Sequence, residues 1–245
     1  MTKRHGVAIA QTAAGKRMKF ENTTVTGIEN AIIGLRLPMS KNFEDAKSKS
    51  DSVFIPGAIS EVKIGADDMR IMQNLIKADG SGKAGEPNSK FLRMIHAQVA
   101  ITAPLYWWKE FDTYKVGTVA NSTSTMHKLA STPITKDCFE MDDYETELRK
   151  VNLPLIWQSL LFNLETLQKL YIETKDKRYW KELIRLLPES WLQTRMIDCN
   201  FATLRNIYAW RRGHKLTEWH SFCDWICTLP LHELITAGTE TGDAK

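Results

Sequence analysis

The sequence has few cysteines, no long apolar run and no strong excess of charge. Its four cysteines, at 138, 199, 223 and 227, form no paired framework of the secreted kind, which favours a reducing cytoplasm. No apolar run approaches the roughly 20 residues that a membrane-spanning helix needs, so no membrane partner is expected. The basic N-terminus carries only a weak apolar stretch, and no signal peptide is predicted. A net charge of +4 suits small anionic ligands and is too weak by itself to indicate duplex nucleic acid.

Familiar catalytic and metal-binding motifs are also missing. The sequence has no Walker phosphate loop, nucleophile elbow or zinc-protease motif. Gly80–Lys83 resembles a phosphate loop superficially, but no predicted strand precedes it, so a flexible loop is the better interpretation. His220, Cys223 and Cys227 have helical spacing that would let them share a metal. Because Cys223 lies on an apolar helix face and no C-x-x-C pair is present, we expect no metal site.

Hydrophobic periodicity gives a coarse picture of the secondary structure. Apolar residues alternate over Ile95–Ala103, the clearest strand signal, and a shorter strand is expected over Lys19–Val25. The polar segment 39–60 is predicted to be a loop with little regular structure. The second half of the chain is helical by the same criterion, with stripes over 153–171, 180–187, 196–211 and 219–226.

The stretch Thr118–Met126, which reads T-V-A-N-S-T-S-T-M, holds the densest run of small polar groups. Five hydroxyls and one amide fall within eight residues. That density suits a loop or helix N-terminus that offers hydroxyls and backbone N–H groups to an anion such as phosphate. The alternative is a solvated turn that caps a helix.

Tryptophans and arginines supply two further candidates. Trp107 and Trp108 belong to an aromatic-basic block just before the hydroxyl-rich stretch. Such rings can stack on a planar ligand, or they can fill the core or an oligomer interface. Arg211 has the side chain best suited to phosphate, because its planar fork donates two hydrogen bonds at once. The alternative is a surface charge near a helix C-terminus, where the helix dipole favours it.

Three segments follow one another in a distinctive order. Ser89-Lys90-Phe91 precedes the clearest strand, Pro104 then opens a helix that runs into the Ser-rich stretch, and Leu187-Pro188 is followed by Asn200, Leu204, Asn206 and Arg211. Together they resemble flavin-dependent thymidylate synthases, whose motifs are S/T-P-F-E-H, R-H-R-x-x-S-x-N-E-x-S-x-R-Y and L-P…N-x-x-x-L-x-N-x-x-x-x-R. The third motif matches without a gap. The resemblance covers residues 85–130 and 178–225.

The second motif is only partly kept. The family's R-H-R positions fall on Thr113, Tyr114 and Lys115, of which only Lys115 keeps a charge. A one-residue insertion aligns Asn121 and Ser124 with the family's Asn and second Ser. The closing R-Y falls on uncharged residues or on Met126-His127, and the histidine of the first motif falls near Arg93.

The resemblance implies a fold and a reaction. The fold is a single α/β domain of the α+β kind over residues 1–245, with a small mixed sheet, a helical C-terminal half, the polar insertion at 39–60 and a frayed tail at 236–245. The implied reaction is reductive methylation of deoxyuridylate, or a related one-carbon modification of a pyrimidine deoxynucleotide. FAD would carry the hydride and methylenetetrahydrofolate the carbon. A homotetramer with sites between subunits is also implied.

The same resemblance assigns roles to individual residues. Ser122, Ser124 and Lys115 are the expected catalytic residues. The expected substrate-binding residues are Arg211, Arg185, Thr123 and Asn121. The expected cofactor-binding residues are Asn206, Asn200, Arg93, Trp107 and Trp108. The competing hypothesis is a scaffold that has lost its chemistry and binds a nucleotide, a nucleic acid or a protein partner.

Overall fold

A four-stranded antiparallel sheet forms the centre of the protein. The computed structural model describes residues 18–54, 62–79, 87–141 and 153–239. In spatial order the strands are β1 (Lys19–Thr26), β4 (His96–Pro104), β6 (Leu192–Asn200) and β5 (Thr118–Ser122). The α/β fold class and the strands β1 and β4 are confirmed. A mixed sheet was expected, but every described pair in this sheet is antiparallel.

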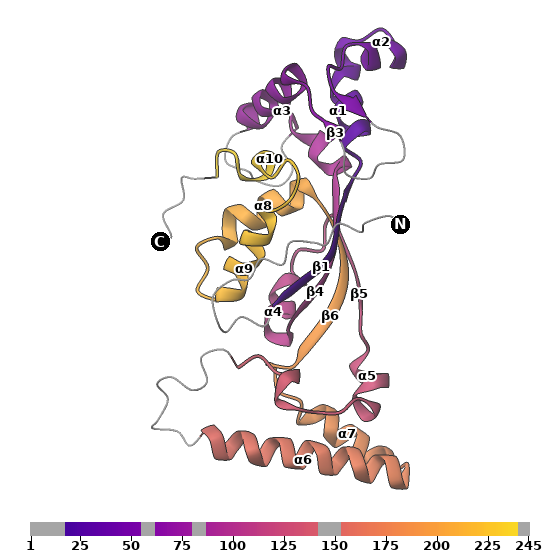
Figure 1. The fold of residues 1–245 in the computed structure, drawn as a ribbon, viewed down its shortest axis with the longest axis vertical. Helices are drawn as coiled ribbons and strands as arrows, with labels where there is room; N and C mark the ends of the chain where they lie inside the picture. The colour runs from indigo at the N-terminus through magenta and orange to yellow at the C-terminus, as the bar shows by residue number, and fades with distance from the viewer. Residues whose placement is uncertain (1–17, 55–61, 80–86, 142–152, 240–245) are drawn as a thin grey trace, which may run out of the picture.

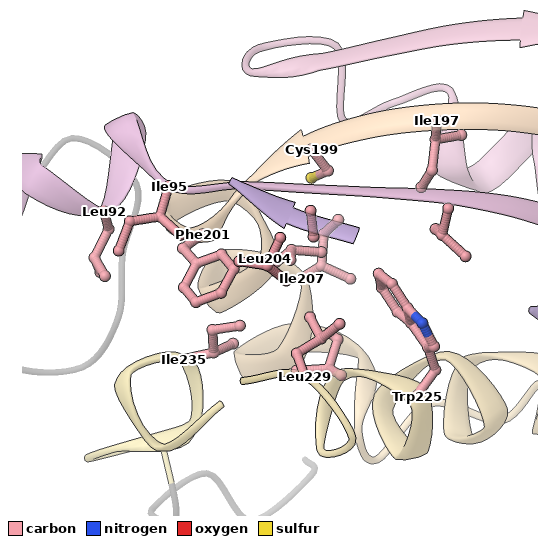
Figure 2. Close-up of a cluster of buried hydrophobic side chains, with 14 of the residues drawn as sticks. Leu92, Ile95, Ile197, Cys199, Phe201, Leu204, Ile207, Trp225, Leu229 and Ile235 are labelled. Carbon is pink, nitrogen blue, oxygen red and sulfur yellow. The ribbon is translucent and has the colours of Figure 1, made fainter. Parts of the chain in front are cut away.

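Helices cover one face of this sheet (Figure 1). They are α4 (Leu105–Phe111), α8 (Phe201–Arg211), α9 (Thr217–Ile226) and α10 (Glu233–Thr236). Figure 2 shows Phe201, Leu204 and Ile207 of α8 beneath the strand that carries Ile197 and Cys199. All five of these side chains are fully buried. The alternate apolar residues of β4 point into the same core, because successive strand residues face opposite sides.

β6 is the element that the sequence misassigned. Residues 196–211 carry a helical stripe, yet the chain is a strand up to Asn200 and a helix only from Phe201. Within β6, Ile197 and Cys199 face the core and Met196 faces solvent. The sequence does not display this alternation, because Gln193 lies on the same side as Ile197 and Cys199 and is buried although it is polar. The residues before Phe201 therefore fit the helical spacing of α8 by coincidence, although they belong to the strand.

A group of shorter elements lies at the upper end of the sheet in Figure 1. They are α1 (Ile28–Arg36), η1 (Leu37–Met39), α2 (Phe43–Ser48), β2 (Val53–Phe54), β3 (Val62–Lys63), α3 (Ala66–Asp79) and η2 (Lys90–Met94). α2 corrects the expectation of little regular structure over 39–60. Its start is stabilised by Asn42, whose side chain accepts a hydrogen bond from the Asp45 N–H at 2.9 Å. Fully buried Asp68 accepts from Arg36 at 2.6 Å, which ties α3 to α1.

A second helical layer lies at the opposite end. α6 (Leu153–Thr174) and α7 (Lys177–Arg185) pack on the segment that holds α5 (Thr125–Lys128), η3 (Leu129–Ser131) and η4 (Lys136–Cys138). The predicted helical stripe 153–171 is confirmed. A smaller core joins these elements through Leu129, Ile134, Phe139, Leu164, Leu183 and Trp191. No described helix combines the length and apolar character needed to cross a membrane.

The chain end differs from the frayed tail expected from residue 236. Thr236 closes α10, and Thr239 is buried with its hydroxyl donating to the Thr236 carbonyl at 2.6 Å. Residues 240–245 lie outside the described residues, as do 55–60 of the polar segment. That the whole chain forms one domain stays a prediction.

Candidate functional site

The hydroxyl-rich stretch is mostly an edge strand, not a loop. Thr118–Ser122 forms β5, which pairs with β6 so that Ser122 lies opposite Arg195 and Asn121 opposite Met196. Because neighbouring residues of a strand face opposite sides, Ser122 is directed toward the helix-covered face and Asn121 toward the open face. The expectation that these groups form one anion cradle is therefore wrong. Three residues near the end of the stretch, Thr123, Ser124 and Thr125, line the cavity described next.

That cavity has a volume of about 720 Å³ and lies beside the end of the sheet, next to the second helical layer. Five hydroxyl side chains line it, from Thr102, Thr123, Ser124, Thr125 and Thr132. Two lysines, one carboxylate and one thiol also line it: Lys19, Lys128, Asp137 and Cys138. The apolar part of the wall comes from Leu129, Trp191 and Leu192. We refer to this cavity as the threonine–lysine pocket.

Hydrogen bonds to β6 fix the hydroxyl side of the pocket. The Thr123 N–H donates to the Thr194 carbonyl at 2.9 Å, and Gln193 Nε2 donates to the Thr123 carbonyl at 2.9 Å. Across β4 and β6, the hydroxyls of Thr102 and Thr194 lie 2.7 Å apart. Gln168 of α6 holds η3 by donating to the carbonyls of residues 129 and 132, both at 2.8 Å. The wall is thus ordered before any ligand enters.

The two lysines give the pocket its charge. Lys19 lies directly opposite Thr102 in the β1–β4 pair, and Lys128 closes α5. Neither ammonium group has a hydrogen-bond or ion-pair partner within the described part of the chain. Ammonium groups bind phosphate as point charges, and hydroxyls add donors that adapt by rotation. The pocket therefore has the chemistry of an anion site, with a volume typical of small-ligand sites.

Arg211 lies elsewhere, in an internal polar cluster on the helix-covered side. Its Nη1 donates to Glu110 Oε2 at 3.0 Å, and its Nε donates to the Tyr114 hydroxyl at 2.8 Å. The guanidinium also lies 4.8 Å from the ring centroid of Trp219. With 19% of its side chain exposed, Arg211 is held between α4, α8 and α9. This arrangement fits a structural charge at the end of a helix better than an arginine that is free to bind phosphate.

Asn200 also has a structural role. Its side chain caps α8 by accepting from the Thr203 N–H at 2.9 Å, and its own N–H donates to the Gly117 carbonyl at 3.1 Å. Gly117 has a φ of +78°, and a Cβ at this position would lie 2.3 Å from Asn200 Nδ2. Only glycine fits there. Asn200 therefore fixes the turn before β5, and its predicted role in orienting a flavin or base is not supported.

Trp107 and Trp108 are fully buried, which contradicts their predicted stacking on a ligand. Trp107 lies 4.9 Å from the rings of both Trp108 and Trp219, at the centre of an aromatic cluster. Arg195 covers the Trp108 ring at 4.3 Å and donates to Asp112 at 2.7 Å. These indoles fill the core, the alternative that the sequence left open.

Four other predicted residues lie outside the pocket lining. Arg185 ends α7 and pairs with Glu182 of the same helix, with 56% of its side chain exposed. Arg93 is exposed on η2, and Lys115 is exposed in the loop after α4. Asn206 is half-buried on α8. Of the twelve predicted site residues, the structure brings only Thr123 and Ser124 to the pocket.

The sequence did not identify most of the pocket. Thr102 could have been found, because the alternation over Ile95–Ala103 already places it on the polar side of the strand. Lys128 lies one helical turn after Thr125, a further usable signal. Lys19 and Trp191 reach the pocket only through strand pairing and the packing of the second helical layer, which no local pattern encodes.

Comparisons with known proteins identify the fold. No protein-family model and no curated protein matches the sequence. The structure is similar to the flavin-dependent thymidylate synthase of Helicobacter pylori complexed with FAD and dUMP. Two structures of that enzyme each align with a TM-score of 0.57 at 16% sequence identity. The first alignment covers 89% of this chain and 96% of the enzyme chain, and the second covers 92% of this chain and 99% of the enzyme chain.

The structure is also similar to the UMP/dUMP methylase PolB of Streptomyces cacaoi, bound with 5-Br dUMP. There the TM-score is 0.54 at 14% identity, over 93% of this chain and 99% of that chain. The predicted resemblance in fold to flavin-dependent thymidylate synthases is confirmed.

Proposed function

We propose that this protein binds a pyrimidine nucleotide of the deoxyuridylate class and modifies its base with a one-carbon unit. The observation that carries the proposal is the threonine–lysine pocket. It offers two ammonium groups without partners among the described residues. Five hydroxyls also line it, of which those of Thr123 and Thr132 already donate to backbone carbonyls. The fold supports the same ligand class, because similar structures hold dUMP or its 5-bromo derivative.

The phosphate is the part of the ligand that the pocket suits best. Lys19 and Lys128 approach from β1 and α5, so they can contact a dianion from two sides. Hydrogen bonds to charged groups contribute about 1.5–3 kcal/mol each, and an anion bound near two ammonium groups benefits further from their charge. Ser124 and Thr125 then supply hydroxyl donors at the same edge.

Substitution of the two lysines tests this assignment. Lys19→Met and Lys128→Met should each weaken dUMP binding roughly tenfold, measured by calorimetry, because each removes one charge-assisted contact. Lys177→Met is the matched control, since this lysine is exposed on α7 and does not line the pocket. If both pocket variants bind dUMP as the wild type does, the phosphate does not lie there.

The only support for FAD and methylenetetrahydrofolate in this proposal is the similarity of the fold. The residues that the sequence assigned to flavin do not form a ring-binding wall in one copy of the chain. Trp107 and Trp108 are enclosed, and Asn200 is used as a helix cap. We therefore assign no residue to flavin and derive no step of the reaction through it. The proposed homotetramer, with sites between subunits, would bring further residues to such a site.

Two measurements separate the parts of the proposal. The purified protein, alone and after addition of FAD, should have the visible absorption of a bound flavin. Thermal unfolding should shift upward with dUMP, because a ligand that binds only the folded state stabilises it. A colourless protein that responds to dUMP would retain nucleotide binding and reject flavin. A colourless protein that is indifferent to dUMP would overturn the proposed function.

A further inference from the structure

The two edges of the central sheet differ in how they are protected from other chains. β1 lies at one edge and β5 at the other. β1 carries the charges of Lys19 and Glu21, and its pairing with β4 shifts register between Glu21 and Thr24, where Asn22 has a φ of +55°. Charges and irregularities of this kind keep an edge strand from pairing with a further strand. The β1 edge is therefore protected against association.

β5 has none of these protective features. Its sequence, T-V-A-N-S, contains no charged residue and no proline, and its pairing with β6 runs without a shift in register. Four of its five residues, from Val119 to Ser122, are exposed. Figure 1 shows the strand along the border of the sheet. β5 is thus an open edge, and open edges are templates for a further strand.

The hydrogen bonds at the two ends of β5 show which of its backbone groups face outward. The Thr123 N–H donates to the Thr194 carbonyl at 2.9 Å, and the Asn200 N–H donates to the Gly117 carbonyl at 3.1 Å, both in the register of the β5–β6 pair. In an antiparallel pair, residues that bond to the neighbouring strand alternate with residues whose N–H and C=O groups face away from it. The residues that face away from β6 are Thr118, Ala120 and Ser122.

These outward groups are free to bond. Within the described part of the chain, no hydrogen bond joins the backbone of Thr118, Ala120 or Ser122 to a residue beyond β6. Each of the three residues presents one donor and one acceptor along the same edge. The edge therefore has a complete hydrogen-bonding pattern for one more strand.

We propose that β5 pairs with β5 of a second copy of this chain, antiparallel about a two-fold axis at Ala120. In this register Ala120 faces its own symmetry mate, and Thr118 faces Ser122 of the partner subunit, so every outward N–H meets an outward C=O. The contact forms about six backbone hydrogen bonds. It joins two four-stranded sheets into one continuous sheet. A two-fold contact uses the same surface on both copies, so the pairing leaves neither β5 edge open.

The side chains of β5 suit this symmetric contact. Only small side chains meet at the axis, because the central residue is alanine, and no like charges are placed opposite each other. On the open face of the sheet, Val119 lies opposite Asn121 of the partner subunit. Val119 is 72% exposed in a single copy, and Met196, on the same face of β6, is 42% exposed. The second sheet covers apolar surface beside the edge as well as bonding to the backbone.

A proline substitution tests the pairing through the backbone. Ala120→Pro removes the central outward N–H but no hydrogen bond to β6, because proline is tolerated where the N–H of an edge strand faces away from its neighbour. In analytical ultracentrifugation, the wild-type protein should have at least twice the mass of one chain, and Ala120→Pro should halve that mass with an unchanged circular dichroism spectrum. Ala120→Ser keeps the N–H and is the matched control, so it should associate as the wild type does. A monomeric wild type, or a folded Ala120→Pro with the wild-type mass, would overturn the proposal.

Disulfide cross-linking decides the question even if Ala120→Pro does not fold. The Cα atoms of two residues in a hydrogen-bonded antiparallel pair lie about 5.5 Å apart, a separation that a disulfide spans. Mild oxidation of Ala120→Cys should therefore give covalent dimers on a non-reducing gel. Glu21→Cys, exposed on the β1 edge, should not give them, and the wild type accounts for the native cysteines. No cross-link in Ala120→Cys, or equal cross-linking of both variants, would contradict the pairing. Neither experiment contains a nucleotide, so the results are independent of the proposed function.

Discussion

Arg211 and Trp219 donate to the same atom, Oε2 of Glu110, from 3.0 and 2.9 Å. His214 Nε2 lies 3.6 Å from that oxygen as well. Because Glu110 belongs to α4, Arg211 to α8 and Trp219 to α9, this carboxylate connects three helices that cover the sheet. Arg211, which the spacing of the third motif assigned to substrate, thus has a structural task that sequence alone could not reveal.

We expect Arg211→Ala to lower the stability of the protein by about 1–3 kcal/mol, because it leaves the partly buried Glu110 without its cationic partner. Urea unfolding monitored by circular dichroism measures the loss. Arg211→Lys should recover little of it, since lysine keeps the charge but cannot donate to Glu110 and Tyr114 from one planar group. A variant with wild-type stability and no affinity for dUMP would instead identify Arg211 as a substrate-binding residue.

Trp107 and Trp108 offer a matched pair of core substitutions. Both are fully buried, but Trp108 Nε1 donates to the Gln193 carbonyl at 2.9 Å, whereas Trp107 Nε1 has no hydrogen-bond partner among the described residues. Replacement by Phe removes indole volume in each case and a hydrogen bond only in Trp108. We expect Trp108→Phe to cost about 1 kcal/mol more than Trp107→Phe in chemical denaturation. Equal losses would contradict the assigned bond, and reduced flavin binding without destabilisation would restore the stacking role.

Cysteine alkylation reports on the pocket without any substitution. Burial raises the pKa of the Cys223 thiol to about 12, and burial likewise raises the pKa of Cys199, so both should resist iodoacetamide. Cys227 is exposed, and Cys138 is half-buried in the pocket lining, so these two should react. Peptide mass spectrometry with and without dUMP should detect protection of Cys138 alone. Cys227 provides the internal control, and equal protection or no protection of both thiols would argue against binding at the pocket.

The open face of the sheet carries a hydrogen-bonded carboxylate that should respond to acid. Asp198 lies 2.6 Å from His96 Nδ1 and 2.9 Å from Gln98 Nε2. Burial by itself raises the pKa of the Asp198 carboxyl. Hydrogen bonds from Gln98 and His96 outweigh this effect of burial, so the pKa lies below its ordinary value. Since the folded pKa is the lower one, this contribution to stability is complete above about pH 4 and is lost as the pH falls through the folded value.

Asp198→Asn should therefore flatten the loss of stability below about pH 4. The change should not exceed about 1 kcal/mol, because both side chains are roughly a third exposed and solvent screens the pair. Unfolding in urea at a series of pH values measures it. His96→Gln removes one of the two donors and should give an intermediate profile. An acid limb that is identical in all three proteins would show that the contacts contribute nothing.

Local patterns predicted the elements that carry strong periodicity. The alternation over Ile95–Ala103 and the stripe over 153–171 each describe a single element with one buried face, and both are confirmed. The prediction failed for β6, because Gln193 is a polar residue on the buried side of the strand and hides its alternation. The helical spacing of α8 also continues into the end of this strand. It failed at 39–60 because Asn42 caps α2 through one local hydrogen bond, which outweighs a polar composition.

The sequence by itself determined the clearest strand and the hydroxyl-rich segment whose end lines the pocket, because these depend on residues close together in the chain. The class of fold came from the resemblance of three motif segments to a known family. The tertiary structure decided which of the candidate groups meet. β5 divides its side chains between two faces, packing encloses Trp107 and Trp108, and an ion pair holds Arg211. Antiparallel pairing places Lys19 beside Thr102, 83 positions along the chain, and helix packing places Trp191 and Lys128 at the same cavity. Such contacts are set by strand register and by the burial of distant apolar faces, which no local spacing records.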